Sequence, residues 1–189
     1  MHCAVPVAAL LVLVACGGKK NPPASPVASA GQPAIWERPT TDGLILQDVD
    51  LNADGRADVH NYYKDRGDAP RLLVRKEVDL DLDGHVDVIS YFDDDGNLIR
   101  EEMDGDFDGQ FDWIDHYRDG HRVMSEADTD YDGLTNVWSY YTEGKIERKE
   151  RDTTGDGRVD YWERFDDEGR VIKTGRDIDG DGTMDTRDE

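Results

Sequence analysis

Beyond residue 40, the chain contains short runs in which apolar and polar residues alternate, rich in β-branched and aromatic side chains. Residues 86–92 and 111–117 are examples. Alternation with a period of two predicts half-buried β-strands, because successive side chains of a strand point to opposite faces. When every second residue is taken, one face of these runs carries most of the apolar side chains and the other face is mixed.

Each run ends in a short turn that contains Gly, and a second, shorter run of strand-forming residues follows. Such turns are typical of β-hairpins, since Gly adopts the left-handed backbone conformation at little steric cost. The turns lie at residues 93–97, 118–121, 142–145 and 166–170, and the second runs at residues 98–102, 123–126, 146–150 and 171–174. The first hairpin departs from this pattern, with a longer turn that contains Gly67 and Pro70.

A nine-residue acidic motif, Asp-x-Asp-x-Asp-Gly-x-x-Asp, separates successive hairpins, and each copy has Gly at its sixth position. The six copies, named loops 1 to 6, are residues 50–58, 79–87, 104–112, 128–136, 152–160 and 177–185. A near-constant period indicates a repeat architecture. We therefore expect an all-β fold over residues 41–189, a repetitive antiparallel β-meander of about ten to twelve short strands with two strands per repeat.

The acidic loops have the spacing of calcium ligands. Close carboxylates repel by about 4 kcal/mol per pair near a protein surface, so a compact loop needs a cation to offset them. Calcium loops supply carboxylates at positions 1, 3, 5 and 9, a carbonyl at position 7 and Gly at position 6. Magnesium is disfavoured because it demands tight octahedral geometry. The alternative is that Asp and Gly are simply good turn formers, but six copies in phase favour calcium, with up to six Ca²⁺ bound.

The expected ligands follow from the motif. Loops 2, 3 and 6 have complete acid sets, loops 1 and 4 each replace one acid with Asn, and loop 5 has a Thr hydroxyl at position 3, so we expect loop 5 to be the weakest site. The ligands are Asp50, Asn52, Asp54 and Asp58; Asp79, Asp81, Asp83 and Asp87; Asp104, Asp106, Asp108 and Asp112; Asp128, Asp130, Asp132 and Asn136; Asp152, Thr154, Asp156 and Asp160; and Asp177, Asp179, Asp181 and Asp185.

Four glutamates stand two residues before a loop: Glu77, Glu102, Glu126 and Glu150. They could be additional ligands, but we expect them to be strand-surface acids that pair with Lys or Arg across the sheet.

The loops resemble the calcium loops of thrombospondin type 3 repeats and of integrin-type propeller blades. They do not resemble a whole EF-hand, since position 12 is Glu only in loop 5 (Glu163) and the helical flanks of that motif are missing. Residues 91–98 and 164–171 are similar to the tyrosine-aspartate (RHS-type) hairpin repeats of large bacterial secreted shells. These resemblances imply calcium-bearing loops on β-hairpins. A closed propeller is not expected, because each blade needs four strands.

The first 15 residues are typical of a secretion signal, with an apolar run over residues 4–14 that is too short to span a bilayer. The segment Leu13-Val14-Ala15-Cys16 resembles the lipobox of bacterial lipoproteins, which implies acylation of Cys16 and membrane attachment through it. Gly17 follows instead of Asp, which in that family favours the outer membrane. In the alternative, an ordinary cleaved signal, Cys16 has no role; either way the protein is exported.

Residues 16–40 are rich in Pro, Ala, Ser and Gly and are expected to form a flexible tether. Cys3 lies in the signal, so the mature chain has no internal disulfide, and small exported domains without disulfides often rely on metal. The net charge is −22, and 21 of the 44 acidic residues stand at loop positions 1, 3, 5 and 9. No basic stripe is present to meet phosphates, so we expect no nucleic-acid partner.

The sequence gives little support for catalysis. The histidines outside the signal do not have the spacing of a catalytic triad or a zinc site. Pairs of Asp residues could resemble the two catalytic acids of a glycosidase, but the periodicity of the loops already accounts for them. We therefore expect a structural or interaction scaffold at the cell envelope, whose metal mainly stabilises the fold. The alternative is an accessory module that binds a glycan or a cell-surface protein through exposed aromatic residues.

Overall fold

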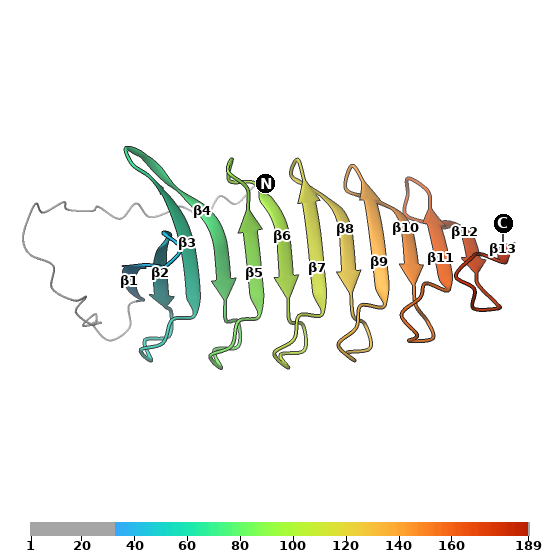
Figure 1. The fold of residues 1–189 in the computed structure, drawn as a ribbon, viewed down its shortest axis with the longest axis horizontal. Helices are drawn as coiled ribbons and strands as arrows, with labels where there is room; N and C mark the ends of the chain where they lie inside the picture. Colours follow the sequence, from blue (N-terminus) through green and yellow to red (C-terminus); the bar gives the residue numbers. More distant parts are fainter. Residues whose placement is uncertain (1–32, 189) are drawn as a thin grey trace, which may run out of the picture.

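The computed structural model describes residues 33–188, which form one antiparallel sheet of 13 strands arranged in sequence order (Figure 1). The expected all-β meander is confirmed, and the sheet is open. Ten strands, β3 to β12, form the five hairpins that the alternation predicted. Strands β1 and β2 before them and β13 after them bring the total above the expected ten to twelve.

The strands are short, and each pairs with its neighbours in the chain. They are β1 (Ala34–Pro39), β2 (Ile45–Asp50), β3 (Val59–Arg66), β4 (Ala69–Val78), β5 (Val88–Phe92), β6 (Leu98–Met103), β7 (Trp113–Arg118), β8 (His121–Ala127), β9 (Val137–Thr142), β10 (Lys145–Arg151), β11 (Tyr161–Phe165), β12 (Val171–Arg176) and β13 (Thr186–Asp188).

Strand β1 lies inside the stretch that composition predicted to be a tether, so the boundary at residue 40 differs from the structure. Residues 34–39 pair in register with β2, and Thr40 closes the turn between them. The Thr40 hydroxyl accepts a hydrogen bond from the Leu44 N–H at 2.9 Å. Pairing with an adjacent strand outweighs the weak strand preference of this Pro- and Ala-containing sequence. The expected signal, Cys16 and the rest of the tether lie outside the described residues.

The two kinds of connection lie at opposite edges of the sheet. Gly-containing turns follow the odd-numbered strands, and all six acidic loops follow the even-numbered strands at the other edge (Figure 1). This arrangement results from the alternation of turn and loop in the sequence, because each antiparallel strand reverses direction. The repeat therefore places six acidic loops in one line.

One face of the sheet carries three rows of side chains that run across the strands. The row beside the loops, named the loop-side row, is mainly apolar from β3 to β9 and then changes: Val59, Val78, Val88, Met103, Trp113, Ala127, Val137, Arg151, Tyr161 and Arg176. The middle row is polar yet contains buried residues: Ser90, Asp115, Ser125 and Ser139. The row beside the turns is again mostly apolar.

Asp115 shows how a buried polar row can be stable. Its carboxylate accepts hydrogen bonds from Trp113 Nε1 at 2.8 Å and Arg122 Nη1 at 3.1 Å, and also from the Ser125 hydroxyl. A buried carboxylate is tolerated when donors of this kind replace its water.

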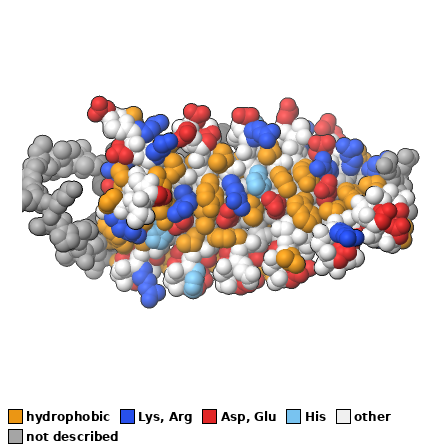
Figure 2. All heavy atoms as spheres, viewed as in Figure 1, with side chains coloured by type: hydrophobic (Ala, Val, Ile, Leu, Met, Phe, Trp, Pro, Cys, Tyr) orange, Lys and Arg blue, Asp and Glu red, His pale blue; other side chains and the backbone are white. Residues whose placement is uncertain are grey.

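The opposite face repeats a cluster of Tyr, Arg and Glu. The Arg75 guanidinium lies 3.9 Å from the Tyr62 ring centroid, and Arg75 Nε is 3.0 Å from Glu77 Oε1. The same arrangement recurs twice, at Tyr91, Arg100 and Glu102, and at Tyr140, Arg148 and Glu150. Figure 2 shows one face of the molecule with hydrophobic, basic and acidic side chains interleaved along its length. Stacked arginines therefore cover aromatic rings that would otherwise be open to water.

Within residues 33–188 the structure contains no helix that could cross a membrane.

Candidate metal centres

Each acidic loop begins at or just after the end of an even-numbered strand and ends before the next odd-numbered strand. The first-position carboxylate accepts main-chain hydrogen bonds from positions 4 and 6 of its own loop. In loop 2, Asp79 accepts the N–H of Leu82 at 2.7 Å and of Gly84 at 2.8 Å. The pair recurs in the other five loops, at Asp50, Asp104, Asp128, Asp152 and Asp177. This carboxylate therefore fixes the shape of the loop.

Two positions in every loop have a left-handed backbone. At position 6, Gly84 has φ +100°, which explains the Gly in every copy. Position 4 is also left-handed in every loop, and the sequence reasoning missed it because four loops have a non-Gly residue there: Ala53, Leu82, Phe107 and Tyr131. A signal was present, since loops 5 and 6 have Gly155 and Gly180 at this position.

The ninth residue closes the loop and joins it to the next. The Asp87 carboxylate accepts the N–H of Leu80 at 2.5 Å, and the Asp87 N–H donates to the Val78 carbonyl at 2.9 Å. The equivalent pairs form in all six loops. The Asp87 carbonyl in turn accepts the N–H of Asp104, the first residue of loop 3. Five such bonds connect the six loops in a continuous line.

The fifth-position carboxylate accepts the N–H of position 7 in all six loops, as Asp83 does from His85 at 2.8 Å. The position 7 residue therefore turns so that its N–H faces the loop. Positions 3 and 5 are exposed in all six loops, whereas position 1 is buried in loops 1 to 5. Each loop thus combines a fixed inner carboxylate with acids that are open to solvent.

Four loops bring three carboxylates together so that one oxygen of each lies within 4.8 Å of the others, which could hold a metal ion. Positions 1, 3 and 9 converge in loops 2 and 6, and positions 1, 3 and 5 converge in loops 3 and 4. The groups are Asp79, Asp81 and Asp87; Asp104, Asp106 and Asp108; Asp128, Asp130 and Asp132; and Asp177, Asp179 and Asp185. Within the described part of the chain, the acids of loops 1 and 5 do not converge in this way.

The donor set is entirely oxygen, which suits a hard divalent cation rather than zinc or copper. The triads leave Asp83, Asp112 and Asp181 of the complete acid sets outside the converged groups. Asp83 is instead in contact with its neighbour, since His85 Nδ1 lies 3.0 Å from Asp83 Oδ2. Asn52, Asn136 and Thr154 keep loop hydrogen bonds of their own. Ion binding by the expected set of four would require side-chain shifts at position 5 in loops 2 and 6 and at the half-buried position 9 in loop 3.

Three of the four third-position aspartates are electrostatically disfavoured as carboxylates. Desolvation, together with repulsion from the other carboxylates of the loop, raises the pKa of Asp81 and Asp106 above the ordinary value for Asp. In loop 4, the side-chain hydrogen bond with Asp128 is the main cause that raises the pKa of Asp130. A cation at these positions would relieve the repulsion.

The four glutamates before the loops are ion-paired residues of the strand surface. Three of them pair with an Arg two residues earlier in the same strand, not across the sheet as expected, and Glu126 pairs with His116 of the adjacent strand at 2.7 Å. Tyr62 and Tyr140 also donate hydroxyl hydrogen bonds to Glu77 and Glu150. These contacts support the ion-pair role.

No protein-family model matches the chain, and no curated protein matches it. Among solved structures, a chain of accessory secretory protein 1, 2 and 3 of Streptococcus pneumoniae is similar, with 15% identity and a TM-score of 0.36. The match covers 67% of this chain and 20% of that one. TarM is similar with 14% identity and a TM-score of 0.25, over 67% of this chain and 19% of that one. The chain spans about a fifth of the length of each, and it is assigned to no family.

Proposed function

We propose that this protein is an exported calcium-binding scaffold of the bacterial cell envelope, attached to the outer membrane through acylated Cys16. The observation that carries the proposal is the regular placement of six acidic loops along one sheet edge, four of them with converged carboxylate triads. The oxygen ligands and the flexible exposed positions favour calcium over magnesium.

The proposed role of the metal is to stabilise the repeat. The sheet has few buried hydrophobic residues, which are Ala34, Leu46, Leu72 and Ala127 among those described. Hydrophobic burial alone therefore contributes less than in a two-layer domain. A cation that bridges positions 1 and 9 of a loop would hold the end of one hairpin to the start of the next.

The magnitude of this effect follows from binding linkage. A site that exists only in the folded state stabilises it by RT ln(1 + [L]/Kd), or about 2.7 kcal/mol when the free ion is at 100 times Kd. The usual net stability of a small domain is about 5–15 kcal/mol. Several such sites would together exceed it only if all of them are occupied at the same time. The scaffold role therefore predicts a large and cooperative dependence of folding on calcium.

The test is a calcium titration by isothermal calorimetry, followed by thermal melting with calcium and with a chelator. We expect heat of binding at up to millimolar calcium and a melting temperature that falls sharply in chelator. Absence of both effects would remove the metal role. The lipid anchor is tested by two measurements: whether globomycin blocks processing of the signal, and whether a radioactive fatty acid labels the protein. Cys16→Ser is the control and should not be labelled.

The accessory binding module remains the second candidate. Its supporting observation is that many exposed large apolar side chains lie on the acidic loops rather than on the sheet faces: Leu51, Leu80, Leu82, Phe107, Phe111, Tyr131, Leu134 and Ile178. Exposed apolar side chains that cluster at one edge are typical of interaction surfaces. Pull-down from envelope extract with and without chelator distinguishes a calcium-dependent partner from a scaffold that has none.

A further inference from the structure

At the fifth loop the loop-side row changes from apolar to basic. The residue immediately before each of the first four loops is apolar. By contrast, Arg151 precedes loop 5 and Arg176 precedes loop 6. Tyr161 stands between these arginines in the sheet, paired with both of them. Two positive charges thus flank one aromatic ring at the only place in the described row where bases replace apolar residues.

The same loop is the one whose acid set is most altered. Thr154 takes the third position, where every other loop has Asp or Asn, and no carboxylate triad forms among the described residues of loop 5. Loop 5 therefore offers a cation fewer carboxylate ligands than loops 2, 3 and 6, which have complete acid sets. The strands beside this junction carry the two additional positive charges of Arg151 and Arg176. This internal contrast points to an anionic ligand at this junction.

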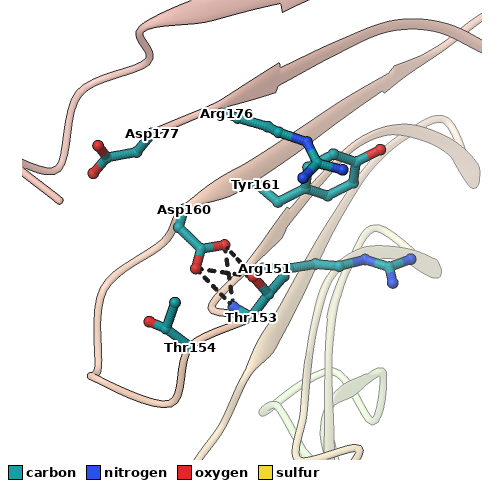
Figure 3. Close-up of a pocket in the computed structure, with 7 residues that line it drawn as sticks. All are labelled: Arg151, Thr153, Thr154, Asp160, Tyr161, Arg176 and Asp177. Carbon is teal, nitrogen blue, oxygen red and sulfur yellow. Dashed lines mark hydrogen bonds between the residues drawn. The ribbon is translucent and has the colours of Figure 1, made fainter. Parts of the chain in front are cut away.

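The two arginines and Tyr161 line a depression of about 430 Å³ together with Thr153, Thr154 and Asp160 (Figure 3). Its volume is in the range of pockets that take small organic ligands. Figure 3 shows Arg176 lying over the Tyr161 ring and Arg151 extending toward the same side of the sheet. The side chains come from β10, β11 and β12, so their spacing is fixed by strand pairing.

Both guanidinium groups have donors left for a ligand. The Arg176 guanidinium carbon lies 5.2 Å from the Tyr161 ring centroid, and among the described side chains no carboxylate forms an ion pair with it. Arg151 Nη2 lies 3.1 Å from Glu163 Oε2 and Arg151 Nε is buried, so this side chain, 40% exposed, can offer a ligand only the outer nitrogens of its guanidinium. Arg176 is therefore the principal contact and Arg151 the second.

The acids beside the pocket are committed to the loops. Asp160 accepts hydrogen bonds from the Thr153 N–H and hydroxyl, at 2.8–3.2 Å. Asp177 accepts the N–H groups of Gly180 and Gly182, and in Figure 3 its carboxylate points away from the two guanidinium groups. Their charges oppose a bulky polyanion, and the net charge of −22 opposes it further.

We propose that the pocket of Arg151, Tyr161 and Arg176 binds a saccharide that carries a carboxylate. The planar guanidinium of Arg176 suits bidentate contact with a carboxylate. The half-buried Tyr161 ring, which Arg176 covers in part, offers its remaining apolar surface to a sugar ring, and the Thr154 hydroxyl oxygen is available to a sugar hydroxyl. The pocket shares Thr154 and Asp160 with the expected ligands of loop 5, which has no carboxylate triad, so its test is made at one fixed calcium concentration.

The test is calorimetric titration of the full mature chain with digalacturonic acid and with its dimethyl ester, at one fixed calcium concentration in both cells. We expect the acid to bind and the ester, which has the same rings without the charges, to bind at least about ten-fold more weakly, as loss of a charge-assisted contact implies. Equal affinity for the two sugars, or binding of neither, overturns the proposal. Equal affinity for a glutamate dipeptide overturns the saccharide assignment.

Arg176→Gln locates the site. Arg176 is exposed, so this variant should keep the melting temperature and the calcium isotherm while losing at least about ten-fold in affinity for the acid. Arg176→Lys keeps the charge but not the planar fork, so an intermediate affinity is expected. Arg118→Gln, which removes an exposed charge from β7, is the matched control and should bind as the parent does. If Arg176→Gln binds the sugar with unchanged affinity, the sugar binds elsewhere and the assignment of the site is overturned. If the protein binds the sugar but not calcium, only the proposed scaffold role fails.

Discussion

The main-chain N–H of Asp104 donates a 2.8 Å hydrogen bond to the carbonyl oxygen of Asp87, joining the first residue of loop 3 to the last residue of loop 2. Both residues also belong to converged carboxylate groups. An ion held by loop 2 would therefore fix the residue from which the next loop starts. Because this bond recurs between every pair of neighbouring loops, stabilisation of one loop is expected to pass to its neighbours.

Asp79 and Asp81 separate the structural role of the loop from its metal role. The buried Asp79 carboxylate accepts two main-chain N–H groups, so Asp79→Ala should lower the free energy of unfolding even in chelator, by about 1–3 kcal/mol. The exposed Asp81 carboxylate accepts a single main-chain hydrogen bond, from the Asp83 N–H at 3.1 Å, so Asp81→Ala should lower the free energy of unfolding mainly when calcium is present. Urea unfolding of both variants, with calcium and with chelator, measures the difference; an equal loss for Asp81→Ala in the two buffers would contradict the metal role.

Loops 2 and 5 should differ in their contribution to calcium-dependent stability. Loop 2 contains a carboxylate triad and loop 5 does not, so Asp83→Ala with Asp87→Ala should reduce the calcium-induced rise in melting temperature more than Asp156→Ala with Asp160→Ala. The change in melting temperature between chelator and saturating calcium is the measurement, since it removes effects that are independent of metal. Equal losses in the two double variants would show that neither Asp83 nor the carboxylate triad of loop 2 determines the affinity for calcium.

The strands and their order could be predicted because alternation and Gly turns are local signals. Residues 86–92 predicted β5, and the Gly at position 6 predicted the loop turn that Gly84 makes with φ +100°. Strand β1 could not be predicted in this way, since its strand conformation depends on pairing with β2 rather than on its own composition.

The candidate site was predicted in its residues but not in its geometry. Spacing identified the acids, but it does not show that Asp79 is a main-chain acceptor while Asp81 is exposed. Which three acids converge differs between loops 2 and 3 although their acid spacing is the same, because spacing does not fix the side-chain conformations. The basic change at Arg151 and Arg176 was visible in the sequence, but its meaning required the register that places them on either side of Tyr161.

Calcium binding should weaken as the pH falls through the raised pKa values of Asp81, Asp106 and Asp130. A folded-state pKa above the unfolded value means that the folded protein takes up protons first, so in chelator these three groups favour folding more as the pH falls through that window. Calcium must displace those protons. Calorimetry in two buffers of different ionisation enthalpy should detect more proton release at a pH just above the ordinary pKa of Asp than near about pH 7.5. Asp81→Asn should release fewer protons, and release that is the same at both pH values would contradict this account.

Leu82 holds a left-handed backbone, φ +67°, with its side chain 43% exposed. The left-handed conformation costs about 1–2 kcal/mol for a residue other than Gly, whereas Gly adds about 0.5–1 kcal/mol of unfolded-state entropy to the cost of folding. Leu82→Gly should therefore raise the free energy of unfolding by up to about 1 kcal/mol, as the natural Gly155 and Gly180 at the same position suggest. Leu80, exposed and two residues earlier, is absent from the left-handed set, so Leu80→Gly should lower the free energy of unfolding. Urea unfolding in saturating calcium compares the two, and an equal loss in both would mean that side-chain contacts of Leu82 outweigh its backbone strain.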